Sequence, residues 1–303
     1  MAGKWEAGAT SWTQAVALKP REKEQSMSAT KSPADPVAAL KEAHRAMWAD
    51  GDYSAVARLM EDVPPHMLSA VGVDADHRVL DVATGTGNVA LRAARSGAQV
   101  TGLDLTPELL DIAAVRAAAL GAEVEWIQGD AEALPFPDQS FDRVLSAFGI
   151  QFAPRHEITT RELIRVCRPG GAIALANWTP EGMIGQQFAI LSRYLPAPPE
   201  FASPPPLWGS EQHIRDLFST FDVELEFERA VLAATFGSAE ELMQFYEANY
   251  GPTIRAKAAL ERNGRWDDCR AELANLFQSQ NRSTDDADLR IEAEYMLIVA
   301  RPQ

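Results

Sequence analysis

Short apolar runs of strand length alternate with helix-like stretches through the middle of the chain. The strand-like runs are residues 78–83, 99–105, 124–130, 141–149 and 172–178. Such alternation is typical of βαβ units, which build a parallel sheet with helices on both of its faces. The pattern therefore predicts an α/β fold with a doubly wound sheet.

Residue types mark the ends of the helix between the second and third strands. Thr106 is a suitable N-cap, Pro107 stands at the first helical position, and Gly121 is a typical helix terminator. Glu108 adds a negative charge where the helix dipole favours one. We expect a helix over residues 107–120.

Two different kinds of segment precede this core. Residues 1–34 show no sustained hydrophobic period, and we expect them to be a disordered extension. Residues 35–72 are expected to form a helical cap, because apolar residues at helical spacing follow Pro36. A second short helix of this cap is expected over 53–61.

The pattern changes after residue 178, where the cofactor-binding core expected over 73–178 ends. The Pro-rich stretch 196–206 is interpreted as a mobile or lid-like insertion that borders the substrate. We expect residues 35–303 to form one domain, whose part over 179–303 carries substrate-side insertions and the final strands. The elements expected there are a helix near 210–219, a strand near 221–233, helices over 238–280 and a last strand over 294–300.

Composition narrows the class of protein. The 303 residues are 46% hydrophobic, which is enough for a sizeable core. A formal net charge of −15 disfavours nucleic-acid and anionic membrane partners, and a homodimer stays open. Cys167 and Cys269 predict neither a disulfide framework nor a metal site. No apolar run is long enough to span a bilayer and no signal peptide is evident, so we expect a cytoplasmic protein without stable membrane insertion.

A glycine-containing loop follows the first strand and is the most informative segment. In VLDVATGTGNVAL the strand ends at Asp81, and Gly85 and Gly87 precede a new helix. Glycines allow unusual backbone dihedrals and a close approach to a nucleotide-like ligand. Gly85, Gly87 and Ala90 also satisfy the fingerprint of dinucleotide enzymes, so an NAD(P)-dependent oxidoreductase is one alternative.

Two further acids lie at the ends of the next strands. Asp104 ends the second strand, where a carboxylate can accept both hydroxyls of a ribose, and Asp130 ends the third. The carboxyl ends of parallel strands line one crevice of an open sheet, so Asp81, Asp104 and Asp130 should converge there.

The order and spacing of four segments resemble the class I S-adenosylmethionine-dependent methyltransferases, particularly the type 11 and ubiquinone-menaquinone C-methyltransferase-like group. The segments are DVATGTG (81–87), GLDLTPELLDIA (102–113), GDAEALPFPDQSFD (129–142) and ELIRVCRPGGAIAL (162–175). The resemblance implies a mostly parallel, seven-stranded Rossmann-like sheet whose last strand is antiparallel. It also implies S-adenosyl-L-methionine as cofactor.

The resemblance assigns roles to particular residues. Asp104 would hold the ribose hydroxyls. Outside the matching segments, Tyr53 of the cap is expected to close over the cofactor, with core packing as the alternative. Ala83 stands where most members have glycine and would slightly crowd the methionine moiety. The remaining implied contacts are Asp81, Gly85 and Gly87 at the methionine and ribose, Leu105, Asp130 and Ala131 at the adenine, and Ser146 near the sulfonium.

The sequence indicates the residues that bind the acceptor less specifically than those that bind the cofactor. If the acceptor must lose a proton, His156 beyond the fourth strand is the predicted general base, with a capping or surface role as the alternative. Phe148, Phe152 and Trp178 could form an aromatic wall, or could be core residues. The remaining histidines, His44 among them, are expected to be structural or solvated.

These observations predict methyl transfer to oxygen, nitrogen or carbon of a small aromatic or lipid-like acceptor. Besides the oxidoreductase, a non-catalytic module that binds the cofactor is an alternative, because the acceptor side contains no indispensable residue. The Arg-Asn-Val type segment expected of quinone-ring methyltransferases is replaced by QFAPRHEITT. The resemblance therefore does not extend to a substrate.

Overall fold

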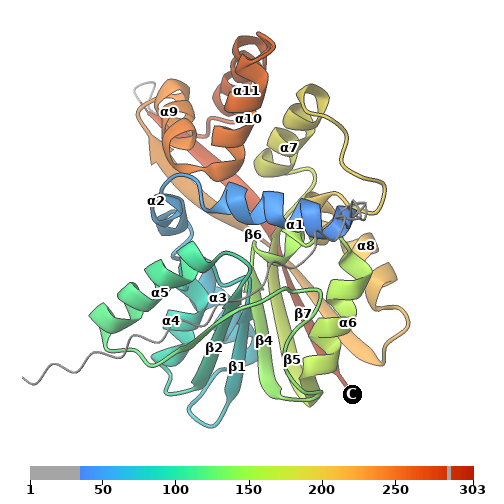
Figure 1. The fold of residues 1–303 in the computed structure, drawn as a ribbon. Helices are drawn as coiled ribbons and strands as arrows, with labels where there is room; N and C mark the ends of the chain where they lie inside the picture. The colour runs from blue at the N-terminus through green and yellow to red at the C-terminus, as the bar shows by residue number, and fades with distance from the viewer. Residues whose placement is uncertain (1–34, 285–287) are drawn as a thin grey trace, which may run out of the picture.

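The computed structural model of the chain describes residues 35–284 and 288–303. The extension expected to be disordered, 1–34, lies outside them. Within the described residues a seven-stranded sheet has the order β3-β2-β1-β4-β5-β7-β6 (Figure 1). The strands are β1 (Arg78–Val82), β2 (Gln99–Asp104), β3 (Glu125–Gln128), β4 (Phe141–Ala147), β5 (Cys167–Trp178), β6 (Val223–Phe236) and β7 (Leu289–Pro302).

Strand directions confirm the predicted sheet. β1 to β5 pair in parallel, whereas β7 runs antiparallel to both of its neighbours, β5 and β6. The central strands are buried on both faces, which explains why they read as continuous apolar runs instead of alternating patterns.

Helices cover the two faces of the sheet and enclose two apolar cores. On one face lie α3 (Val63–Val71), α4 (Asn88–Ala94) and α5 (Pro107–Leu120), and on the other lie α6 (His156–Val166) and α8 (Glu211–Phe218) (Figure 1). The predicted boundaries of α5 agree with the structure, and Gly121 adopts the left-handed conformation that ends it. Thr106 stands at the N-cap, but its side chain makes no capping hydrogen bond.

The N-terminal cap contains three helices. α1 (Pro36–Trp48) crosses above the carboxyl ends of the strands, and α2 (Tyr53–Arg58) follows it (Figure 1). Residues of α3, which no pattern predicted, pack in the core against the sheet. α1 contains no fully buried residue, so its charged contacts carry much of its attachment.

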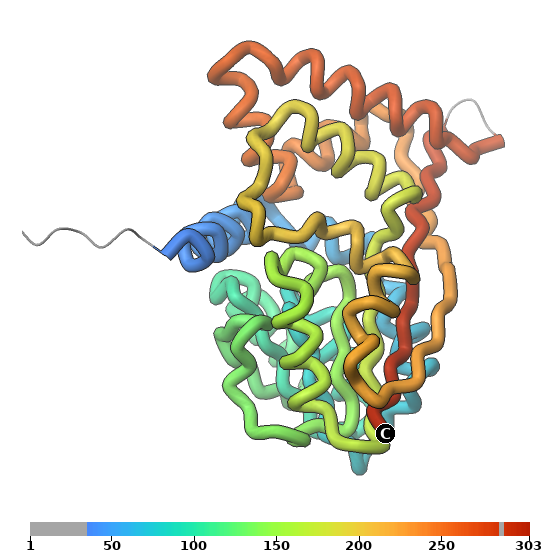
Figure 2. The backbone as a smooth tube through the Cα atoms, turned by 90° about the vertical axis from the view of Figure 1, so that its right-hand side faces the viewer, coloured from blue at the N-terminus to red at the C-terminus, as the bar shows by residue number. Residues whose placement is uncertain are grey.

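A second group of helices stands above the sheet. The β6–β7 ladder pairs Val231–Phe236 with Leu289–Glu294, which lie beyond the part of β7 that pairs with β5. This extension leads to helices that stand above the level of α1 (Figure 2). They are α7 (Met183–Tyr194), α9 (Ala239–Asn249), α10 (Gly251–Glu261) and α11 (Trp266–Ser279).

The Pro-rich stretch 196–206 does not take the position expected of it. It leads into the 3₁₀ helix η2 (Pro205–Gly209), whose Trp208 is fully buried in the core beneath α6 and α8. Its residues line none of the cavities described below. Residues of α1, α7 and α9 line those cavities instead.

Candidate functional site

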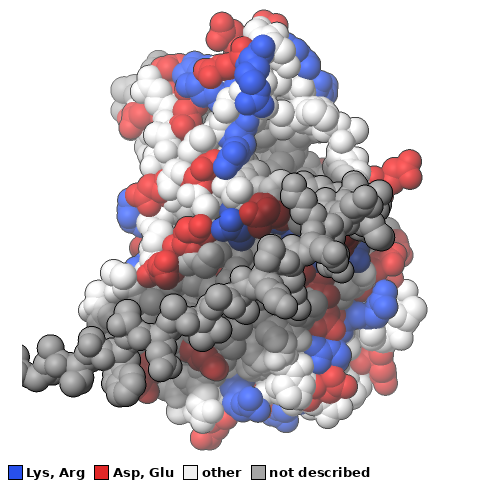
Figure 3. Space-filling model, in the orientation of Figure 1, with Lys and Arg blue, Asp and Glu red and all other residues white. Residues whose placement is uncertain are grey.

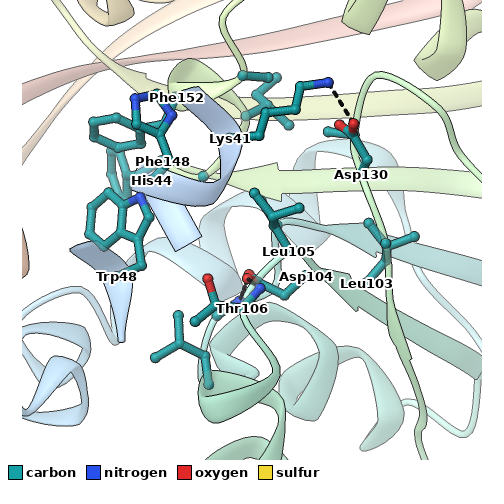
Figure 4. Close-up of a pocket in the computed structure, with 18 of the residues that line it drawn as sticks. Lys41, His44, Trp48, Leu103, Asp104, Leu105, Thr106, Asp130, Phe148 and Phe152 are labelled. Carbon is teal, nitrogen blue, oxygen red and sulfur yellow. Dashed lines mark hydrogen bonds and ion pairs between the residues drawn. The ribbon is translucent and has the colours of Figure 1, made fainter. Parts of the chain in front are cut away.

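A cavity opens at the carboxyl ends of the parallel strands, beneath α1 (Figure 4). We call it the cofactor cavity. Of the residues predicted to bind the cofactor, it is lined by Tyr53, Ala83, Gly85, Asp104, Leu105, Asp130 and Ala131. Tyr53 comes from α2 (Tyr53–Arg58), whereas the ends of β1, β2 and β3 bring the other residues together, as expected for a doubly wound sheet.

The loop after β1 turns sharply at this cavity. Gly85 has φ of 55°, a left-handed conformation that favours glycine, and a Cβ there would point toward the ring of Tyr53 at 3.5 Å. Ala83 also has a positive φ of 54°, although it carries a Cβ. Such strain persists only where surrounding contacts hold the backbone.

Asp104 holds this loop from the neighbouring strand. Its Oδ2 accepts a hydrogen bond from the backbone N–H of Gly85 at 2.8 Å, and its Oδ1 accepts one from Thr106 at 2.8 Å. Each carboxylate oxygen has two lone pairs, so each can still accept a ligand hydroxyl. Burial raises the pKa of Asp104, against the effect of these backbone donors. The buried carboxylate fits a ribose edge.

Asp81 faces a smaller adjoining pocket, which shares Ala83 and Gly85 with the cofactor cavity. Its Oδ2 accepts hydrogen bonds from the hydroxyl of Thr84 at 2.5 Å and from the backbone N–H of Ala90 at 2.9 Å. Burial raises its pKa to about 7, although both hydrogen bonds act in the opposite direction. Asp81 therefore ties the loop to the start of α4.

Asp130 takes part in an ion-pair network that reaches α1. Its carboxylate lies 2.5 Å from the Nζ of Lys41, which also lies 2.5 Å from Glu132 (Figure 4). Arg155 pairs with the same Glu132 at 2.7 Å, and the Glu132 side chain is fully buried. Two cations thus compensate this buried carboxylate, and the network anchors α1 over the cavity.

Besides Asp81, which lines only the adjoining pocket, two further predicted cofactor contacts do not line the cofactor cavity. Gly87 has φ of 85°, and a Cβ there would lie 2.8 Å from the ring of Trp126, so this glycine permits close packing instead of ligand contact. Ser146 is fully buried, and its hydroxyl donates to the backbone carbonyl of Val82 at 2.7 Å. Ser146 therefore links β4 to β1 and does not face a ligand.

A second cavity adjoins the first and is rich in aromatic side chains. We call it the acceptor cavity, after the aromatic residues predicted to hold the acceptor. It shares Trp48, Tyr53, Phe148 and Phe152 with the cofactor cavity. Its other lining residues are Val56, Met60, Trp178, Ile184, Gln187, Tyr246 and Tyr250. None of these described residues is charged, whereas charged side chains of both signs spread over the outer surface (Figure 3).

Stacked rings form one wall of the acceptor cavity. The rings of Phe148 and Trp178 are 3.8 Å apart and almost parallel, at 11°. Phe148 has a positive φ of 58°, and its N–H donates to the carbonyl of Ala176 at 2.7 Å. The structure thus places all three predicted aromatic residues, Phe148, Phe152 and Trp178, around this cavity.

Sequence patterns did not reveal several lining residues. Lys41, His44 and Trp48 follow one face of α1, whose packing over the sheet is a tertiary feature. Tyr246 and Tyr250 are four residues apart at the end of α9, a spacing that core positions also have. Gln187 on α7 lay in a stretch without a recognisable motif.

His156 does not lie at either cavity. It is the first residue of α6 and only 1% exposed, with its Nδ1 3.0 Å from Nε2 of His213. Burial, together with His213, lowers its pKa to about 3. The prediction relied on closeness to the fourth strand along the chain, but the residue packs beside Trp208, away from both cavities. The predicted role as general base does not fit this position.

Comparisons with known proteins agree with the geometry. A family model described as a methyltransferase domain matches residues 79–171. A Mycobacterium tuberculosis protein, named as uncharacterized, is 46% identical over 215 residues, which are 70% of this chain and 78% of the relative. The demethylmenaquinone methyltransferase of Thermus thermophilus is 35% identical over 176 residues, 56% of this chain and 79% of that enzyme.

A solved structure shares the fold. The YcgJ protein of Bacillus subtilis superposes with a TM-score of 0.54 at 22% identity, over 79% of this chain and 98% of that one. The glycine motif fitted both NAD(P) and S-adenosylmethionine, and the family matches favour S-adenosylmethionine. They also support an enzyme over a non-catalytic module. The chain belongs to the class I S-adenosylmethionine-dependent methyltransferases.

Proposed function

We propose that this enzyme methylates a small aromatic or lipid-like acceptor bound in the acceptor cavity. The observation that carries the proposal is the direct contact between the two cavities through Trp48, Tyr53, Phe148 and Phe152. Uncharged aromatic walls favour flat or apolar ligands.

The cofactor would lie along the ends of β1 to β3. Asp104 would accept the ribose hydroxyls, Leu105 and Ala131 would border the adenine, and Gly85 would leave room for the methionine part. When bound, S-adenosylmethionine supplies a methyl group on a positively charged sulfur. The protein's contribution would be to hold the acceptor in line with that methyl group and to exclude water.

Further features support an apolar acceptor that carries one polar group. A third cavity continues from the acceptor cavity through Trp178 and Ile184 and is lined mainly by aliphatic side chains such as Met183 and Leu232. This space would suit an apolar substituent. Gln187 is 3% exposed, and its Oε1 has no hydrogen-bond partner among the described residues. It would accept a hydrogen bond from an acceptor O–H or N–H.

A methyl-transfer screen tests the proposal. Labelled S-adenosylmethionine would be incubated with phenols, aromatic amines, prenyl-type lipids, and polar controls such as amino acids, nucleosides and transfer RNA. We expect label in the aromatic or lipid-like compounds. Label confined to the polar or macromolecular controls would contradict the proposal.

A cavity-filling variant connects this activity to the acceptor cavity. Ile184 lines the acceptor cavity but not the cofactor cavity, so Ile184→Trp should block the acceptor and leave S-adenosylhomocysteine binding intact. Ala189→Trp, on the exposed side of the same helix, is the matched control. Unchanged acceptor kinetics in Ile184→Trp would place the acceptor elsewhere.

A further inference from the structure

His44 lies on the face of α1 that covers the cofactor cavity. Lys41, His44 and Trp48 are separated by three and four residues, so they share this face, and all three line the cavity. Lys41 extends to Asp130, whereas Trp48 also lines the acceptor cavity. Figure 4 shows His44 in one group with the aromatic residues Trp48, Phe148 and Phe152.

The carboxylates of the site are already engaged. Asp81 and Asp104 accept hydrogen bonds that hold the glycine loop, and Asp130 pairs with Lys41. These acids and His44 all lie on the cofactor side, and none of them lines the acceptor cavity. The acids differ from His44 because their hydrogen bonds and ion pair already engage them, which makes them less suited to take a proton from an acceptor.

The remaining ionisable groups leave one candidate base. Burial raises the pKa of every tyrosine in the acceptor cavity, so these side chains remain neutral phenols and act as hydrogen-bond donors; they are Tyr53, Tyr246 and Tyr250. Among the described residues that line the two cavities, His44 carries the only imidazole.

The surroundings of His44 keep it neutral. Burial lowers its pKa, while a hydrogen bond to the backbone of Phe152 and the charge of Glu132 act in the opposite direction. The charged groups nearby are Lys41, Asp130 and Glu132, which form one ion-pair network. A neutral imidazole that donates one N–H to a backbone carbonyl presents a lone pair on its other nitrogen.

We propose that His44 is the general base of the reaction and that the acceptor is a phenol whose hydroxyl oxygen is methylated; this inference rests on the proposed function. The imidazole takes the hydroxyl proton as an oxygen lone pair forms the bond to the methyl carbon. The carbon–sulfur bond breaks, and its electron pair stays on the sulfur. The products are a methyl ether, S-adenosylhomocysteine and protonated His44, which returns its proton to solvent.

The combination of a neutral imidazole and an aromatic cavity selects this acceptor class. A phenol has a pKa of about 10, close enough to that of an imidazole for assisted proton transfer, whereas an unactivated hydroxyl such as that of water is far less acidic. An aromatic amine attacks through its neutral nitrogen and needs no base beforehand. A phenol is therefore an aromatic nucleophile that benefits from His44.

Acceptors that differ in acidity test the proposal. The His44→Gln variant and the unchanged enzyme would be compared on ordinary phenols and on nitrophenols that are already ionised at the assay pH. We expect kcat on ordinary phenols to fall by about 100-fold or more in His44→Gln, with little change on ionised nitrophenols. The control is His77→Ala, because His77 pairs with Asp74 and lines neither cavity.

A binding measurement separates proton acceptance from structural support. In the protein saturated with S-adenosylhomocysteine, visible absorbance reports the pH at which a bound nitrophenol ionises. This ionisation should occur at lower pH with His44 present than in His44→Gln, because the imidazole takes the proton. The affinity for S-adenosylhomocysteine should be equal in both proteins.

Several results would overturn the inference. An equal loss of kcat on both classes of phenol would assign His44 a structural role, and an unchanged kcat on ordinary phenols would remove it from the reaction. Methylation of aromatic amines or lipids but not phenols would refute the phenol assignment while leaving the proposed function intact. If neither aromatic nor lipid-like compounds are methylated, the proposed function itself fails together with the inference.

Discussion

The carboxylate of Asp104, at the end of β2, accepts a hydrogen bond from the backbone N–H of Gly85 at 2.8 Å, in the loop after β1. The acid expected to hold the ribose therefore also fixes the glycine turn beside it. Cofactor binding by Asp104 would therefore be coupled to the conformation of this loop.

Replacing Asp104 should weaken cofactor binding through both of these effects. Asp104→Ala removes the ribose acceptor and two hydrogen bonds to the backbone, so the dissociation constant for S-adenosylhomocysteine should rise about 10- to 100-fold. Calorimetric titration measures this dissociation constant. Asp76→Asn, at an exposed turn, is the control. An unchanged dissociation constant in Asp104→Ala would remove Asp104 from the cofactor site.

Asp81 should make the stability of the ligand-free protein depend on pH. Its pKa of about 7 in the folded state exceeds the value near 4 of an unfolded chain, so the folded state binds the proton more tightly. The resulting stabilisation of the folded state is present below about pH 4 and is lost as the pH rises to about 7. The free energy of unfolding should fall by at most about 1.4 kcal/mol per pH unit. The free energy of unfolding, measured with urea, should decrease less between pH 5 and pH 7.5 in Asp81→Asn than in the unchanged protein. Parallel pH profiles would contradict the assignment.

Lys41 should stabilise the packing of α1 over the sheet. In Lys41→Met the buried carboxylate of Glu132 keeps only Arg155, and the free energy of unfolding should fall by about 1–3 kcal/mol. Arg45→Met is the matched control on the same helix, because Arg45 pairs with Glu108 at the surface and little change is expected. Equal effects of both substitutions would show that the buried network does not carry the attachment.

Gln187 should distinguish acceptors that carry a hydrogen-bond donor. Gln187→Leu removes a buried amide oxygen that has no partner within 35–284 and 288–303, so the ligand-free protein should gain about 1 kcal/mol of stability. The KM for acceptors with an O–H or N–H at that position should rise, and acceptors lacking the donor should be unaffected. Gln186→Leu serves as control, since Gln186 bonds to the backbone of Glu181. A uniform change in KM for all acceptors would refute the role.

The sequence predicted the elements whose signals are local. The central strands are long apolar runs because helices cover both faces, and Gly121 ends α5 because it adopts a left-handed conformation. The helical cap expected over 35–72 was not given a separate helix at the position of α3, where Pro64 and Pro65 stand. Both prolines lie in the first turn of the helix, where no intrahelical N–H donor is required.

Only the part of the site that lies at the ends of the parallel strands could be predicted from the sequence. Asp104 and Asp130 reach the cofactor cavity because parallel strands end at one edge of the sheet. Ser146 also lies near a strand end, but its side chain bonds to β1 instead of facing the cavity. His44 belongs to a helix whose position depends on the ion pairs of Lys41, and no pattern within α1 could indicate which histidine reaches the site.

A crystal structure with bound S-adenosylhomocysteine tests the central claim most directly. We predict that its ribose hydroxyls lie within hydrogen-bonding distance of Asp104, its adenine lies between Leu105 and Ala131, and its sulfur points toward Phe148 and the acceptor cavity. A ligand bound outside this cavity, or with its sulfur directed away from the acceptor cavity, would contradict the account.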